Sequence, residues 1–331
     1  MSRWDAAKKL WAVSRSLHEQ RGGSVLHYFF DSMHCSFRHG ASAENYLVLR
    51  FYELSERQRG EYLTSGRSKA VDTALNRKAT KEDKQNVGRK DLFNRAFSGL
   101  VRRDFLYAPD CSFEEFTAFL DRHEPCMIKP VAGTMGKGIE KRCCPEDRRG
   151  FFAHCREEKL LLEEVIRQHP ALSEINPACI NSVRINAARD AKGDVRLIGA
   201  CLKCGGVGAV TDNFHSGGVA YPLDMETGRV SGPGRNNREI REYTRHPGTD
   251  FFMPGFALPF WAEVKELARQ GMERAPSLGY VGWDIALTPD GPELIEGNFH
   301  WPGGNIIQFD RVGKYPLILS CLGEKDEKHT D

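Results

Sequence analysis

The stretch GWDIALTPDGPELIEGN, residues 282–298, most constrains how this chain can fold. Polar and apolar side chains alternate on both sides of Pro289–Gly291, a tripeptide typical of a tight turn. The pattern predicts two antiparallel strands. If the turn centres on its middle residue, Asp284 faces Glu296 across the hairpin. Asn298, two residues further along, then lies on the same face as Glu296.

The predicted pairing suggests a metal site. Two carboxylates directly opposite each other in a sheet repel, and a divalent cation removes that cost. Asp284, Glu296 and Asn298 offer only hard oxygen ligands, which suit Mg²⁺ held jointly with nucleotide phosphates. The alternative is a solvated acidic face. The apolar residues that alternate with Asp284 favour the metal site, because they indicate a half-buried strand.

The rest of the chain mixes strand and helix patterns, which predicts an α+β fold with largely antiparallel sheets. Strands are expected at 125–130, 159–166 and, as a pair joined by a turn, 181–203. Helices are expected at 112–120, which begins with a capping box, and at 259–275.

The first 85 residues have helical spacing, including the segment 42–55. The charged stretch RKATKEDKQNVGRK, residues 77–90, is predicted to be a linker or exposed loop. These patterns predict a helical region 1–85 with a boundary after it, and a disordered tail 321–331.

Composition narrows the class of protein. The chain has 47 basic and 45 acidic side chains, so its net charge of +2 lacks the strongly basic signature of most nucleic-acid binders. We find no signal-peptide pattern and no apolar run near the length that spans a bilayer, and we therefore expect a cytoplasmic protein without a membrane partner. The ten cysteines are expected to be reduced thiols. The one C-x-x-C, at Cys201 and Cys204, lacks a second pair for a zinc ribbon.

The segment CMIKPVAGTMGKGIEK, residues 126–141, combines a strand with a glycine-rich loop. It does not fit the Walker A spacing, because Val131 and Gly138 stand where that motif needs glycine and a hydroxyl. Lys129 at the strand end and backbone N–H groups of the loop could together hold phosphate oxygens. The segment alone does not distinguish a phosphate site from a surface turn.

Taken in order, Lys129-Pro130 with the glycine loop, LLEEVI, and Asp284 followed by IEGN resemble the motif set of the ATP-grasp superfamily. More closely, the chain resembles the sugar-transfer-associated ATP-grasp family, which is related to alpha-L-glutamate ligases. The stretches that carry the closer resemblance are KDLFNRAF, RRDFL, NSVRIN, DNFHSGGVAYPLD and GWDIALTPDGPELIEGNFHWPGG. The resemblance implies an ATP-grasp fold preceded by a helical region. Its two α+β subdomains, which grip ATP, would be a small subdomain 86–162 with the glycine-rich loop and a larger subdomain 163–320 with the metal site.

The same resemblance implies roles for individual residues. The first and second phosphate-binding lysines would be Lys90, which departs from the common Asp-Lys order, and Lys129. The lid over the phosphates would contain Gly133, Gly136, Lys137 and Gly138. Two alternatives stay open for Lys137, which either contacts phosphate only on closure or is solvated. The adenine hinge would be Glu163, Glu164, Val165 and Ile166, with Glu163 serving the amino group of the base. Gln168 stands near the position where the superfamily often has a glutamate for the ribose. Asp284, Glu296 and Asn298 would be the Mg²⁺ ligands.

Four further residues are candidates for catalysis. Arg184 and Lys203 would project from strands and neutralise charge as the γ-phosphoryl group transfers. Asn213 and His215 lie in the polar, glycine-rich stretch TDNFHSGG, an expected active-site loop. There His215 could act as a base on an amine, and a surface histidine is the equally open alternative.

These expectations point to a carboxylate–amine ligase that uses ATP and two Mg²⁺ ions. It would form an amide through an acylphosphate, in glycan or specialised-metabolite biosynthesis. The nucleotide half of the site does not separate this ligase from a kinase that phosphorylates a sugar or another small alcohol. A non-catalytic ATP-binding accessory protein is a third possibility, which the retained acidic pair disfavours.

Overall fold

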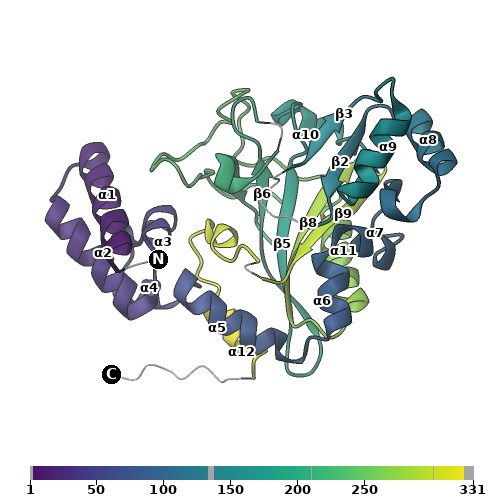
Figure 1. Ribbon diagram of the computed structural model, residues 1–331. Helices are drawn as coiled ribbons and strands as arrows, with labels where there is room; N and C mark the ends of the chain where they lie inside the picture. The colour runs from purple at the N-terminus through teal and green to yellow at the C-terminus, as the bar shows by residue number, and fades with distance from the viewer. Residues whose placement is uncertain (1–2, 133–137, 210, 301, 324–331) are drawn as a thin grey trace.

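The computed structural model describes residues 3–132, 138–209, 211–300 and 302–323. The chain begins with a run of helices, namely α1 (Arg3–Arg21), α2 (Val25–His39), α3 (Ala43–Val48), α4 (Glu56–Gly60), α5 (Ser65–Leu75), α6 (Lys81–Gly88) and α7 (Lys90–Ala96). Of these, α1 to α4 lie at one end of the molecule, and α6 and α7 lie beside the two antiparallel sheets (Figure 1). Helices α5 and α6 lead from this region to the sheets. The expected N-terminal helical region is therefore confirmed.

The first sheet has the strand order β1-β4-β2-β3, and all its pairings are antiparallel. Its strands are β1 (Phe105–Tyr107), β2 (Cys126–Pro130), β3 (Glu140–Arg142) and β4 (Leu160–Glu164). Helices α8 (Phe113–Arg122) and α9 (Arg148–Glu157) pack against it through a small aromatic core around Phe116 and Phe151. The capping box predicted at Ser112 is present at the start of α8.

The second sheet has the order β7-β6-β5-β8-β9 and is also antiparallel. Its strands are β5 (Ser182–Arg189), β6 (Val195–Cys204), β7 (Val219–Pro222), β8 (Tyr280–Thr288) and β9 (Gly291–Asn298). Helix α11 (Trp261–Arg274) covers one face, where Gly271 lets the helix approach Trp283; a Cβ there would lie 2.9 Å from the indole. Two shorter helices, α10 (Pro170–Ile175) and α12 (Tyr315–Cys321), complete this part.

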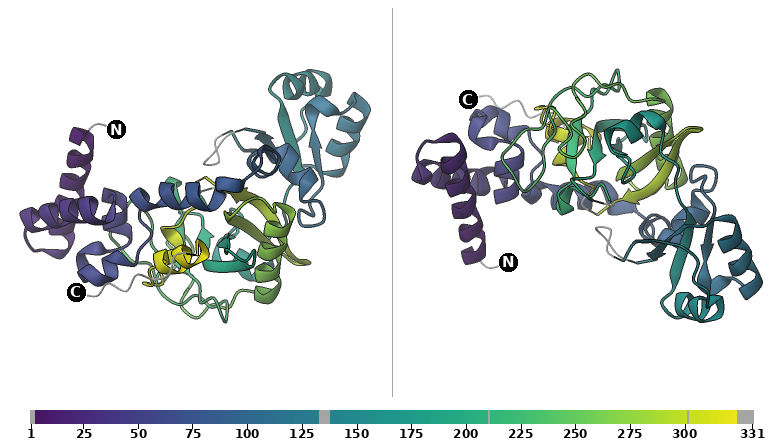
Figure 2. Two further views of the ribbon diagram at one scale, coloured as in Figure 1. Left: turned by 90° about the horizontal axis from the view of Figure 1, so that it is seen from below. Right: turned by 90° about the horizontal axis from the view of Figure 1, so that it is seen from above.

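Three views place the second sheet in the middle of the molecule (Figures 1 and 2). The N-terminal helices lie at one end, and the first sheet with α8 and α9 lies at the other. The predicted α+β class with two antiparallel sheets is thus confirmed. A site between the sheets would therefore involve the segment that follows β4 and the β8–β9 hairpin.

The β8–β9 hairpin pairs Asp284 with Glu296 as predicted, but by a different route. The turn consists of Pro289 and Asp290 alone, because Thr288 pairs with Gly291. With that turn, a regular ladder would place residue 295 opposite Asp284. A bulge adds Ile295 to β9 and shifts the register by one residue, since Ile285 pairs with Leu294. The bulge therefore brings the two carboxylates face to face.

Two local predictions were wrong. The stretch 77–90 is not a linker, since it contains helix α6, which begins after the N-cap Thr80 and buries Val87. The side chain of Thr80 accepts a hydrogen bond from the backbone N–H of Asp83, so a polar segment still makes a capped helix. The helix expected over 42–55 is interrupted, because Arg50 adopts a left-handed conformation with φ 55°.

Across the described ranges, no helix combines the length and the apolar character that crossing a bilayer requires. Of the predicted tail, residues 324–331 lie outside the described part of the chain.

Candidate functional site

The polar face of the second sheet gathers buried charges around Asp284. Because β5 and β6 pair beside β8, Arg184 and Lys203 lie on the same face as this carboxylate. Arg184 donates from Nε to Oδ1 of Asp284 at 2.8 Å and from its terminal nitrogen to Oδ2 at 2.7 Å. The Nζ of Lys203 lies 3.0 Å from Oδ1 of Asp284. Burial alone would raise the pKa of Asp284, but the two cations outweigh it and hold this pKa well below its usual range.

Glu296 and Asn298 complete this face from the edge strand β9. Asn298 donates from Nδ2 to Oε1 of Glu296 at 3.2 Å, which leaves the amide oxygen of Asn298 as an acceptor for a ligand. Burial raises the pKa of Glu296, and the neighbouring Asp284 carboxylate raises it further. A cation placed beside Glu296 would relieve both effects.

The three residues predicted as Mg²⁺ ligands fit that ion in the kind of donor they offer, namely two carboxylates and an amide oxygen. They do not contribute equally. Asp284 already accepts three hydrogen bonds from Arg184 and Lys203, so Glu296 and Asn298 have the more available oxygens. In the described part of the chain, no group of three or more His, Cys, Asp or Glu side chains is arranged to hold a metal ion. Phosphate oxygens would therefore have to supply much of the coordination, as is usual for Mg²⁺ at nucleotide sites.

Lys129 extends from β2 and forms an ion pair with Glu163 of β4, its Nζ lying 2.5 Å from Oε2. Glu163 also accepts hydrogen bonds from Arg103 and from Asn94 of α7. Burial would raise the pKa of Glu163, but Arg103 and Lys129 outweigh it and hold this pKa well below its usual range. In this arrangement the Glu163 carboxylate fixes the lysine and does not face a base.

Lys90 begins α7, and its backbone N–H donates to the carbonyl of Val131 at the end of β2. Burial lowers the pKa of Lys90, and the Lys129 ammonium lowers it further while Glu296 opposes the change. The structure therefore brings both predicted phosphate lysines into electrostatic contact, with Glu296 nearby.

The predicted hinge lies in two different settings. Glu163 and Glu164 belong to β4, which pairs with β1 on one side and β2 on the other. Val165 and Ile166 follow the strand, so their backbone groups are the ones outside the sheet that could read a base. The side-chain oxygen of Gln168 accepts from the backbone and side chain of Asn181, and its nitrogen donates to the carbonyl of Asn176. The predicted ribose acceptor is therefore engaged within the protein.

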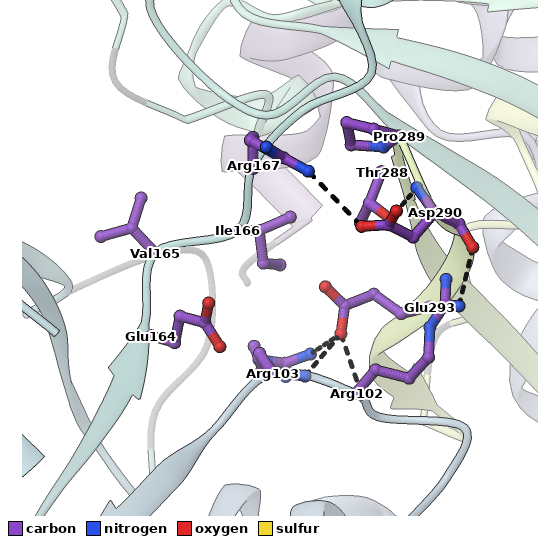
Figure 3. A pocket seen from close by; sticks show the side chains of 10 residues that line it. All are labelled: Arg102, Arg103, Glu164, Val165, Ile166, Arg167, Thr288, Pro289, Asp290 and Glu293. Carbon is purple, nitrogen blue, oxygen red and sulfur yellow. Dashed lines mark hydrogen bonds and ion pairs between the residues drawn. The ribbon is translucent and has the colours of Figure 1, made fainter. Parts of the chain in front are cut away.

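A pocket of about 370 Å³ lies between this hinge and the β8–β9 turn (Figure 3). The residues that line it are Arg102, Arg103, Glu164, Val165, Ile166, Arg167, Thr288, Pro289, Asp290 and Glu293. Three arginines face three acidic side chains, and dashed lines in Figure 3 join Arg167 to Asp290 and Arg103 to Glu293. Because these charges balance within the protein, we assign no ligand to this pocket.

Part of the predicted lid lies outside the described residues, namely Gly133, Gly136 and Lys137. Gly138 is described and has φ 73°, a left-handed conformation that glycine adopts without strain. It lies against the ring of Pro130, so the loop returns to the end of β2.

The loop 211–218 contributes a residue that the sequence did not single out. Asp212 accepts from the backbone and hydroxyl of Ser182, and its Oδ1 lies 3.6 Å from Nζ of Lys203. Asp212 thereby links the loop to the charged face. The same loop holds the two predicted residues, Asn213 and His215. The Asn213 side chain caps a short 3-10 helix by accepting a hydrogen bond from the backbone N–H of His215. The imidazole ring of His215 is exposed and contacts Asn237.

Arg103 and Asn94 are the other residues that the sequence analysis missed. The signal for Arg103 was present in RRDFL, but its two carboxylate partners, Glu163 and Glu293, are 60 and 190 residues away. Only the packing of the two sheets brings them together.

Two antiparallel sheets that meet at a lysine, a hinge and an oxygen-rich strand pair define an ATP-grasp fold. Residues 148–312, from α9 to beyond β9, match the sequence profile of the sugar-transfer associated ATP-grasp family. The resemblance noted in the sequence is thereby confirmed for this segment of the chain.

No curated protein matched the chain. Solved structures that resemble it include N5-carboxyaminoimidazole synthetase from Staphylococcus aureus complexed with ADP, at 11% identity and a TM-score of 0.47, covering 75% of this chain and 55% of that one. D-alanine-D-alanine ligase from Coxiella burnetii matches at 12% identity and a TM-score of 0.41, covering 79% of this chain and 62% of that one. L-amino acid ligase from Bacillus licheniformis matches at 12% identity and a TM-score of 0.45, covering 75% of this chain and 51% of that one. The match thus spans less than two thirds of each of these proteins.

Proposed function

We propose that the protein is an Mg²⁺- and ATP-dependent carboxylate–amine ligase. The observation that carries this proposal is the buried polar face on which Arg184 and Lys203 meet Asp284, with Glu296 and Asn298 beside it. Cations that neutralise a transferring phosphoryl group and oxygens that hold its counterion are the two parts such a reaction needs. The match of residues 148–312 to the ATP-grasp family supports the same reaction class.

In the proposed reaction, Lys129 and Lys90 bind phosphates, and Val165 and Ile166 offer backbone groups to the base. Glu296 and Asn298, with a smaller share from Asp284, would hold Mg²⁺, and the ion would supply positive charge that stabilises the phosphate groups. Arg184 and Lys203 stand where they can stabilise the negative charge that develops as the substrate carboxylate attacks the γ-phosphoryl group. The activated carboxylate is an acylphosphate, and an amine then displaces phosphate to form an amide.

The acylphosphate of the proposed reaction requires a site that excludes water. An acylphosphate hydrolyses readily, so the glycine-rich segment between β2 and β3 is proposed to close over it. Asp212 links the loop 211–218 to Lys203, and this link supports the proposal that Asn213 and His215 serve the acceptor side of the site.

Product analysis tests the proposal. The protein should be incubated with ATP, Mg²⁺ and pooled carboxylates and amines, one of the carboxylates being labelled with ¹⁸O. The proposal predicts ADP, free phosphate that carries ¹⁸O, and a condensed product. A phosphorylated substrate without free phosphate would establish a kinase instead, and binding of ATP without any turnover would indicate an accessory protein.

A further inference from the structure

Arg103 is buried between the two sheets, and its side chain is only 2% exposed. From the first sheet it contacts Glu163, to whose Oε2 its Nε donates at 2.9 Å. From the second sheet it contacts the edge strand β9, donating to the carbonyls of Leu294 at 2.7 Å and Ile295 at 3.2 Å. One planar guanidinium therefore joins both sheets.

The contact with Glu163 extends to the nucleotide side of the site. Lys129 and Arg103 both donate to the same atom, Oε2 of Glu163, at 2.5 and 2.9 Å. Because Arg103 takes part of that oxygen, Glu163 holds the Lys129 side chain in place without pairing with it alone. The Lys129 charge then remains available to a phosphate, since a lone buried pair would neutralise it more completely.

The contact with β9 reaches the bulge that sets the proposed metal ligands. Ile295 is the extra residue of that bulge, and it immediately precedes Glu296. A bulge residue loses its regular ladder partner, and β9 is the edge strand, so its outward carbonyls have no strand to pair with. Arg103 supplies hydrogen bonds to these carbonyls and thereby fixes the backbone from which Glu296 projects.

Fold stability alone gives a weak reason for this arrangement. A buried network of charges is often no more stabilising than apolar side chains of similar volume, whereas it specifies geometry well. Here the network contains Arg103 and Lys129 against Glu163 and Glu293, and it is balanced in charge. Its bonds include those to Glu163, which holds Lys129, and to Leu294 and Ile295, which precede Glu296.

We propose that Arg103 is a positioning residue that sets the distance and orientation between the phosphate-binding Lys129 and the metal-binding strand β9. This inference rests on the proposed function, because it assumes that Mg–nucleotide binds between these two groups. It assigns no chemical step to Arg103, which acts only through Glu163 and β9.

The test compares Arg103→Lys with Arg102→Lys. Lysine keeps the charge at residue 103 but cannot reach Glu163 and two β9 carbonyls together. Arg102 is the matched control, since it is the adjacent arginine and donates to the carbonyls of Asp290 and Pro292 in the same hairpin without contacting Glu163. Binding of Mg–ADP is measured by calorimetry on the full chain, with thermal unfolding measured in parallel.

Arg103→Lys should weaken Mg–ADP binding by about tenfold or more, the loss expected for one charge-assisted hydrogen bond. Arg102→Lys should stay within about twofold of the unmodified protein. Equal nucleotide affinity in Arg103→Lys would overturn the inference and leave the proposed function standing. Failure of the unmodified protein to bind Mg–ADP would overturn both.

If Arg103→Lys does not fold, the double variant Arg103→Gln with Glu293→Gln replaces it. This variant leaves Lys129 and Glu163 as a balanced pair, so loss of charge balance no longer contributes. Weakened Mg–ADP binding in this folded variant supports the positioning role. Unchanged binding shows that Arg103 has only a structural role and overturns the inference.

Discussion

At the scale of single residues, the sequence indicated the chemical types of the site but not how they pair. The alternation around Asp284 predicted a partly buried carboxylate opposite Glu296, and the structure has that pair. It also shows that Arg184, which lies 100 positions earlier, takes both oxygens of Asp284. No local pattern carries that information, because the partner depends on which strand lies next to β8.

Glu163 illustrates the same limit. The resemblance placed it in the adenine hinge, with its carboxylate serving the amino group of the base. The structure turns that carboxylate inward to Arg103 and Lys129. The roles assigned to individual residues of the site stay predictions.

The buried Glu163 carboxylate should make the stability of the protein depend on acid pH. Its pKa is lower in the folded protein than in the unfolded chain, so it stabilises the fold above the ordinary glutamate pKa and loses this contribution as the pH falls below it. Glu163→Gln should lower the free energy of unfolding by about 3 kcal/mol at pH 7 and should flatten its dependence on pH between 5 and 3.

Urea unfolding at several pH values measures this effect. Glu158→Gln is the matched control, because Glu158 is an exposed glutamate near the same strand. An acid dependence in Glu163→Gln as steep as in the unmodified protein would contradict the assignment.

At the scale of secondary structure, periodicity located most strands and helices of the second half of the chain. It missed the bulge at Ile295, because an inserted residue leaves the alternation on each side intact. It missed α6 because that helix is mostly polar and rests on its cap and on one buried face. Composition suggested a linker there, whereas the cap residue Thr80 was the more informative signal.

The cap of α6 gives an element-scale prediction. Thr80→Ala removes the hydroxyl that accepts from the backbone N–H of Asp83, and the hydroxyl also contacts Ser277. The free energy of unfolding should fall by about 1 kcal/mol. Thr117→Ala is the control, since the Thr117 hydroxyl bonds within helix α8 and caps nothing. Chemical denaturation of both variants measures the difference; equal stability of Thr80→Ala and the unmodified protein would show that the cap does not hold α6.

At the scale of the whole molecule, the two sheets approach each other through a few buried charges. The N-terminal helices lie at the end of the molecule opposite to the first sheet (Figure 2). The antiparallel pattern and the order of motifs predicted this class of fold. The way the sheets meet could not be predicted, because it depends on Arg103 and on contacts that span up to 192 residues. The division of the chain at residues 85, 162 and 320 stays a prediction.

The central claim is that the charged face of the second sheet binds ATP through Mg²⁺. Calorimetric titration of ATP tests it most directly, with Mg²⁺, with a chelator, and with the variants Glu296→Gln and Glu263→Gln. Glu263 is an exposed residue of α11 and serves as the control. We expect the unmodified protein to bind ATP in the presence of Mg²⁺. The ATP affinity should fall at least about tenfold in the chelator and in Glu296→Gln, and it should be unchanged in Glu263→Gln. Equal ATP affinity in all four titrations, or no binding in any of them, would contradict the claim.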